Sequence, residues 1–155
     1  MLEIFLSSIL YFFVMQASNH YKKTSIVLFS LWVVFMFFML FMPGDLLAQR
    51  RSSLFNIPHS DKIIHCALFG GFTLFLQFML FFNTSIKLRK IYLISIGVCL
   101  LFGIITEIIQ ALTFEWCGRR FELKDYVSDV IGGVLALVFF KIIEKKVNKR
   151  LQNEK

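Results

Sequence analysis

The sequence predicts an all-α fold: a polytopic membrane helical bundle with four transmembrane helices, preceded by a short N-terminal hydrophobic helix. Of the 155 residues, 57% are hydrophobic and only 17% are charged, whereas a soluble domain averages about 45–50% apolar and about 25% charged residues. The apolar residues fall in blocks with few ionisable groups, and a membrane-spanning helix needs about 20 such residues. No linker or low-complexity segment separates the blocks, so we expect one compact domain.

Four of the apolar blocks are long enough to cross a membrane as helices, in which the backbone satisfies its own hydrogen bonds. They are residues 25–42, 63–82, 91–112 and 126–143. The first block is followed by Pro43 and Gly44, which do not readily continue a helix.

The N-terminal segment allows two interpretations. Residues 4–15 form an apolar run, interrupted by Ser7 and Ser8, that is short for a span. The run also lacks the basic start and the small-residue cleavage site of a secretory signal. An interfacial helix and a short fifth transmembrane helix both fit it. We therefore divide the chain into an N-terminal hydrophobic segment (1–23), a transmembrane domain (24–143) and a basic tail (144–155).

The lysines and arginines predict how the bundle is oriented. Because successive spans cross the membrane in opposite directions, these residues fall on two sides: eleven on one side, which includes the basic tail, and six on the other. The larger set marks the cytoplasmic side, so we expect a cytoplasmic C-terminus and outward-facing loops at 44–61 and 113–124. The net charge of +7 is then explained by topology and by contact with anionic membrane lipids, and no nucleic acid is expected as a partner.

Polar residues in the predicted spans gather at the outward-facing side. Three pairs lie there at helical spacing: Asp61 with His65, Glu107 with Gln110, and Asp125 with Asp129. The members of each pair share one helix face, because they are three or four residues apart. A carboxylate at the centre of a span costs about 2.5–3.5 kcal/mol and usually faces the bundle interior. We therefore predict one outward-facing polar site shared by three helices.

Each of these residues also has a purely structural interpretation. Asp61 and Asp125 could cap their helices, where an acidic residue is favourable. His65 could be an ordinary packing residue, and Glu107 and Asp129 could join helices by hydrogen bonds. The placement of the whole set at one depth favours a functional site.

Three short motifs resemble those of the VanZ-like family of small bacterial membrane proteins: DKIIH…F, G…E..Q and GRRFELKD…D..GG. The matching residues are Asp61, Lys62, His65, Phe69, Gly103, Glu107, Gln110, Arg119 or Arg120, Asp125, and Gly132 or Gly133. Asp129 stands where many members carry asparagine, so a hydrogen-bonding role is expected there. The resemblance covers about residues 25–140.

The resemblance implies a multi-pass protein of the bacterial inner (cytoplasmic) membrane, with a role in the cell envelope. It also implies a link to antibiotic resistance through glycopeptide (teicoplanin-type) susceptibility. The molecular activity of the family is not established, so a shared fold does not by itself assign a reaction.

Binding is the first function that these residues suggest. The site would hold an anionic, amphipathic or lipid-linked envelope ligand, such as a glycolipid. Guanidinium groups match phosphate and carboxylate groups bidentately. The candidate ligand-binding residues are Lys62, Gln110, Arg119, Arg120 and Asp129.

Catalysis is the alternative, so whether the chain is an enzyme stays open. A hydrolase or transferase acting on a lipid-linked substrate would use His65 as general base, oriented by Asp61, and Glu107 as a second acid or base. The candidate catalytic residues are Asp61, His65, Glu107 and Asp125. The sequence requires no cofactor, although a divalent metal held by His65 and the nearby carboxylates would fit the residue types.

Overall fold

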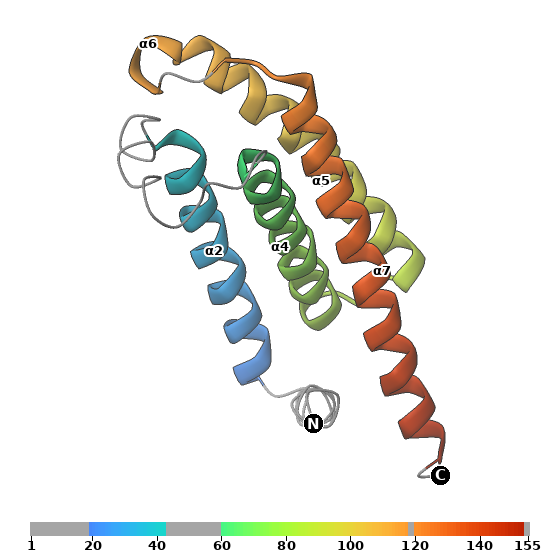
Figure 1. Ribbon diagram of the computed structural model, residues 1–155. Helices are drawn as coiled ribbons and strands as arrows, with labels where there is room; N and C mark the ends of the chain where they lie inside the picture. The colour runs from blue at the N-terminus through green and yellow to red at the C-terminus, as the bar shows by residue number, and fades with distance from the viewer. Residues whose placement is uncertain (1–18, 43–59, 118–119, 154–155) are drawn as a thin grey trace.

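The computed structural model describes residues 19–42, 60–117 and 120–153, and every regular element in these ranges is a helix (Figure 1). The helices are α2 (Asn19–Phe41), α4 (Ser60–Asn83), α5 (Leu88–Leu112), α6 (Phe114–Cys117) and α7 (Leu123–Asn153). All but the short α6 are long and apolar enough to cross a membrane. The predicted all-α fold, with four helices that are long and apolar enough to span a membrane, is therefore confirmed among the described residues.

The helices extend beyond the predicted spans, because their terminal turns are polar. Helix α4 begins at Ser60 and α7 at Leu123, each three residues before the predicted block. Helix α7 also continues to Asn153, so residues 144–153 of the predicted basic tail prolong the last span as helix. The predicted N-terminal hydrophobic helix at 4–15 lies outside the described residues.

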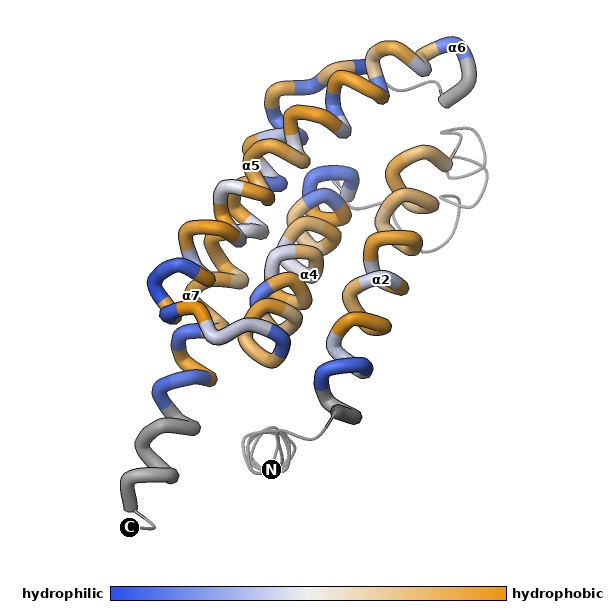
Figure 2. The backbone as a smooth tube through the Cα atoms, turned by 180° about the vertical axis from the view of Figure 1, so that it is seen from behind, coloured by the Kyte–Doolittle hydropathy of each residue, from blue (hydrophilic) through white to orange (hydrophobic). Residues whose placement is uncertain are grey.

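Hydrophobic residues run along all four long helices, and hydrophilic residues gather toward their ends (Figure 2). One cluster of buried apolar side chains forms a core in which α2, α4 and α5 meet: Met36, Leu40, Leu68, Phe69, Phe72, Leu76 and Cys99. Many other large apolar side chains are exposed on the outside of the bundle, among them Leu31, Val34, Phe38, Leu93, Leu101 and Val138. An apolar outer surface of this kind is expected of helices surrounded by lipid.

Helix α4 is the central helix, since it packs against α2, α5 and α7 (Figure 1). Its contact with α7 is backbone to backbone. A methyl group at Gly132 would overlap the carbonyl oxygen of Cys66 and would lie 2.9 Å from the amide nitrogen of Gly70. Small residues allow membrane helices to approach this closely. The contact holds the first turns of α4 and α7 side by side, which is where the predicted polar pairs lie.

Hydrogen bonds attach α2 to both α4 and α5. The indole of Trp32 donates to the carbonyl oxygen of Leu68 at 3.0 Å, and the amide of Gln110 donates to that of Leu40 at 3.0 Å. The Trp32 ring also lies directly over Gly71. These hydrogen bonds and the packing of the Trp32 ring thus fix the position of α2 against α4 and α5.

We expect Trp32→Phe to lower the free energy of unfolding by about 1 kcal/mol, because phenylalanine keeps much of the ring packing but donates no hydrogen bond. The measurement is the thermal unfolding midpoint of the purified protein in detergent. Phe38→Leu is the control, since Phe38 lies on the same helix and is 60% exposed. An unchanged midpoint for Trp32→Phe would contradict this role of the hydrogen bond.

Candidate functional site

Four of the predicted site residues meet at one end of the bundle, where α4 begins, α5 ends and α7 begins. They are His65 on α4, Glu107 on α5, and Asp125 and Asp129 on α7. All four are buried. Ion-pair distances of 4.0 Å or less join His65 to each of the three carboxyl groups. The structure thus brings polar side chains from three helices together in one buried cluster.

The imidazole of His65 lies at the centre of the cluster. Its Nδ1 is 2.9 Å from Oδ1 of Asp129, which is hydrogen-bond distance, and 4.0 Å from Oε1 of Glu107. Its Nε2 faces Oδ2 of Asp125 at 3.9 Å. Asp125 and Asp129 are one turn apart on α7, so they approach the two nitrogens of the ring from the same helix.

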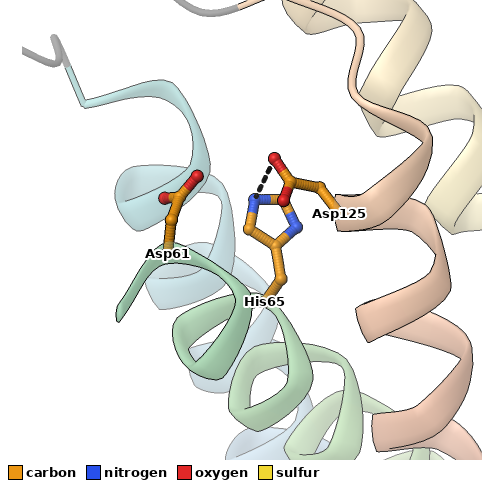
Figure 3. A group of neighbouring side chains, drawn as sticks. All are labelled: Asp61, His65 and Asp125. Atoms are coloured by element: carbon orange, nitrogen blue, oxygen red, sulfur yellow. Dashed lines mark ion pairs between the residues drawn. The ribbon is translucent and has the colours of Figure 1, made fainter. Parts of the chain in front are cut away.

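Asp61 lies one turn before His65 on α4, as the four-residue spacing predicts (Figure 3). One ligand atom from each of Asp61, His65 and Asp125 can be chosen so that all three lie within 4.8 Å of one another. The sequence predicts that Asp61 orients His65. In the structure, Asp129 on α7 is at hydrogen-bond distance from the ring, so Asp129 is the residue placed to orient it.

Lys62 closes the cluster on its exposed side. Its Nζ lies 2.5 Å from Oδ1 of Asp125 and 2.7 Å from Oε2 of Glu122. The Glu122 side chain is 53% exposed, whereas that of Asp125 is only 7% exposed. Lys62 therefore links a buried carboxyl group to one at the surface.

Glu122 was not among the predicted site residues, but it contacts both Glu107 and Lys62. Its carbonyl oxygen accepts the first hydrogen bond of α7, from the Asp125 amide at 2.9 Å, so Glu122 is the N-cap residue of that helix. Its own amide donates to Oε2 of Glu107 at 3.0 Å. The first N–H groups of a helix have no intrahelical acceptor, and an acidic group near them is favourable. This rule predicts an acidic group near the start of α7, but it does not identify Glu107 as that group.

The remaining predicted binding residues have other surroundings. Gln110 is buried and donates to Leu40 on α2, so its amide joins helices. Arg120 is exposed, and its guanidinium lies 4.8 Å from the centre of the Phe114 ring. Arg119 lies outside the described residues. Lys62 is thus the predicted basic residue that the structure brings into ionic contact with the cluster.

Apart from Oδ1 of Asp125, which lies 2.5 Å from the Lys62 ammonium group, three polar atoms of the cluster are fully buried and have no hydrogen-bond partner among the described residues: His65 Nε2, Glu107 Oε1 and Asp129 Oδ2. Such atoms are costly, because they lose their hydrogen bonds to water without replacement. Two of the three are carboxyl oxygens, so the cluster has more acceptors than donors. It suits a cation, a proton or a hydrogen-bond donor better than a bare anion.

Comparison of the chain with models of known protein families, with curated proteins and with solved structures finds no match. A function for this chain therefore has to be argued from the chemistry of its own residues.

Proposed function

We propose that this chain is a VanZ-like integral membrane protein of the bacterial cell envelope, with an outward-facing site that binds an anionic, amphipathic or lipid-linked ligand. The observation that carries the proposal is the buried cluster of His65 with Glu107, Asp125 and Asp129. Ionisable residues inside a membrane bundle are expensive and usually mark a functional site.

The positions of the motif glycines support the resemblance to that family. Gly132 lies against the backbone of Cys66, and a methyl group at Gly103 would lie 3.4 Å from Oδ2 of Asp129. Residues from three motifs that are far apart in the sequence are therefore neighbours around His65. A shared site explains why short motifs on three different helices occur in the same chain.

The basic residues support an outward-facing site at the inner membrane of a bacterium. The end of the bundle opposite the cluster carries exposed lysines and arginines: Lys22, Lys23, Lys87, Arg89, Lys90, Lys141 and Lys145. An excess of such residues is typical of the cytoplasmic side. The C-terminus would then be cytoplasmic and the cluster would lie at the outer leaflet.

A ligand would reach the cluster through the ion pair between Lys62 and Glu122. His65 and Glu107 are 0% exposed, so the site is closed in this state. The Glu122 carboxyl group is half exposed, and an anionic headgroup would compete with it for the Lys62 ammonium group. The exposed guanidinium of Arg120, in the segment that carries Glu122, provides a second cation. Donor groups of the ligand would then meet the unpartnered oxygen of Glu107.

Expression of the chain in a teicoplanin-susceptible bacterium tests this proposal. We expect the wild type to raise the minimum inhibitory concentration of teicoplanin. His65→Ala and Glu107→Gln should abolish the effect, because each removes a buried group of the cluster. Membrane accumulation and gel-filtration profiles of both variants should match those of the wild type.

Glu115→Gln is the matched control, since it removes one acidic charge at an exposed position of α6 and should keep the effect. A wild type without effect would contradict the proposal. Loss of folded protein in both cluster variants would also contradict it, by assigning the residues to stability alone.

A membrane-embedded hydrolase or transferase is the second candidate, and the orientation of the imidazole favours it. Asp129 holds Nδ1 of His65 at 2.9 Å, while Nε2 has no hydrogen-bond partner among the described residues. A carboxyl group that fixes one nitrogen leaves the other available to accept a proton from a nucleophile. Mass spectrometry of envelope lipids incubated with the protein separates the candidates. His65-dependent conversion in excess of the protein supports an enzyme, and bound but unaltered lipid supports a binder.

A further inference from the structure

We propose that His65, Glu107 and Asp129 bind one divalent transition-metal ion, of the Zn²⁺ or Mn²⁺ class. These three residues supply the ligands, so binding of the ion can be measured independently of the proposed function. Its use rests on the proposed function, which it deepens: the ion would supply the positive charge that an anionic headgroup needs in an acidic site.

The distances between the ligand atoms fit such an ion. From Nδ1 of His65, Oδ1 of Asp129 is at 2.9 Å and Oε1 of Glu107 is at 4.0 Å. One ligand atom from each of the three residues can be chosen so that all lie within 4.8 Å of one another. Ligand atoms around a tetrahedral ion at about 2.0–2.2 Å are roughly 3.3–3.6 Å apart. The two distances from Nδ1 lie on either side of that value, so small side-chain rotations suffice.

Two candidate ligand sets share His65, and the buried atoms without hydrogen-bond partners favour the set with Glu107 and Asp129. In the alternative set, Asp61 with His65 and Asp125, the Asp125 carboxyl group already has Lys62 as its counter-ion at 2.5 Å. In the proposed set, Oε1 of Glu107 and Oδ2 of Asp129 are buried without a hydrogen-bond partner among the described residues. A cation would compensate both carboxyl groups.

The groups around the proposed ligands are arranged to support them. Oε2 of Glu107 accepts the Glu122 amide at 3.0 Å, which leaves Oε1 for the ion. With Nδ1 of His65 on the ion, Nε2 carries the proton and faces Asp125 at 3.9 Å. A ligand histidine usually donates its other N–H to a carboxylate, and that partner orients the ring. Lys62 in turn holds Asp125.

The mixture of donors indicates the class of metal. Imidazole suits zinc, iron and copper, whereas carboxyl oxygens suit manganese and magnesium. One nitrogen with two carboxyl oxygens is therefore expected to favour Zn²⁺ or Mn²⁺ over Ca²⁺, which takes six to eight oxygen ligands. Three protein ligands leave a fourth position free, which is the arrangement of sites that also bind a substrate or a ligand.

The test is a metal-binding measurement on the full chain, purified in detergent without a histidine tag and treated with a chelator. Equilibrium dialysis against Zn²⁺ or Mn²⁺, followed by elemental mass spectrometry, should give about one equivalent per chain. His65→Ala and Glu107→Gln should lose this binding, and Glu115→Gln should keep it. Asp125→Asn should retain binding with an affinity lower by about 10–100-fold, because it alters only the partner of the ligand histidine.

Two results would overturn the inference: wild-type protein with no stoichiometric metal, or loss of binding in Asp61→Asn but not in Glu107→Gln. The wild-type measurement does not depend on whether any variant folds. It also separates this inference from the proposed function. A chain without metal whose His65→Ala variant loses the teicoplanin effect would retain the proposed function, whereas bound metal without any teicoplanin effect would retain only the ion site.

Discussion

Gly132→Ala should strongly destabilise the bundle, although it adds only one methyl group. That group would overlap the carbonyl oxygen of Cys66 and lie 2.9 Å from both the Cys66 carbonyl carbon and the Gly70 amide nitrogen. All three atoms belong to the backbone of α4, so no side chain can rotate to make room. We expect a loss of about 3 kcal/mol or more, at or beyond the upper end of the usual overpacking range.

Gly97→Ala is the matched control for this prediction. Gly97 also lies within a membrane-spanning helix, but a methyl group there would have no neighbour within 4 Å. Replacing a helical glycine by alanine normally gains roughly 0.5–1 kcal/mol. In detergent, the thermal unfolding midpoint should therefore fall for Gly132→Ala and rise for Gly97→Ala. A Gly132→Ala midpoint equal to that of the wild type would refute the backbone contact.

Lys62→Met should have the largest effect among the ionic residues, lowering the free energy of unfolding by about 3 kcal/mol. Removing one partner of a buried ion pair costs about 3–5 kcal/mol, because the other charge remains buried alone. The Asp125 side chain is only 7% exposed, and Lys62 Nζ is 2.5 Å from it. Since the Lys62 side chain is 23% exposed, water reduces the cost to the lower end of that range.

A double-mutant comparison tests whether the unpaired charge of Asp125 causes the loss of stability in Lys62→Met. Asp125→Asn in the Lys62→Met background should recover most of the lost stability, because it removes the unpaired charge. Glu122→Gln should change the free energy of unfolding by about 0–1 kcal/mol, since its side chain is 53% exposed. Reversible unfolding in mixed detergent micelles measures all four proteins. Equal effects of Lys62→Met and Glu122→Gln would contradict a buried pair.

The fold could be predicted because lipid imposes a simple rule on the sequence. Uninterrupted apolar blocks have to be helices, and the four long helices follow from them. The ends of those helices could not be placed to the residue. Polar turns such as Ser60–Ile63 at the start of α4 are helical, although their composition resembles that of a loop.

The candidate site could be predicted in part. Four-residue spacing places Asp61 with His65, and Asp125 with Asp129, on common helix faces. The same spacing does not say which neighbouring helix each side chain meets. Two partners were accordingly not predicted: Glu107 binds the amide of Glu122, and Gln110, three residues after Glu107, binds a carbonyl group of α2. Such contacts depend on the rotation of α5 about its axis and on the backbone conformation of the segment before α7, and the sequence specifies neither.

The glycine contact between α4 and α7 has a consequence for biosynthesis. Chains emerge N-terminus first, and α7 is the last of the four spans to be made. Until it inserts, α4 lacks the backbone surface of Gly132, and His65 lacks both Asp125 and Asp129. A ribosome-bound intermediate that ends before α7 would therefore hold the uncompensated polar groups of His65 and Glu107 inside the bilayer. Completion of the last helix both closes the bundle and brings Asp125 and Asp129 to His65.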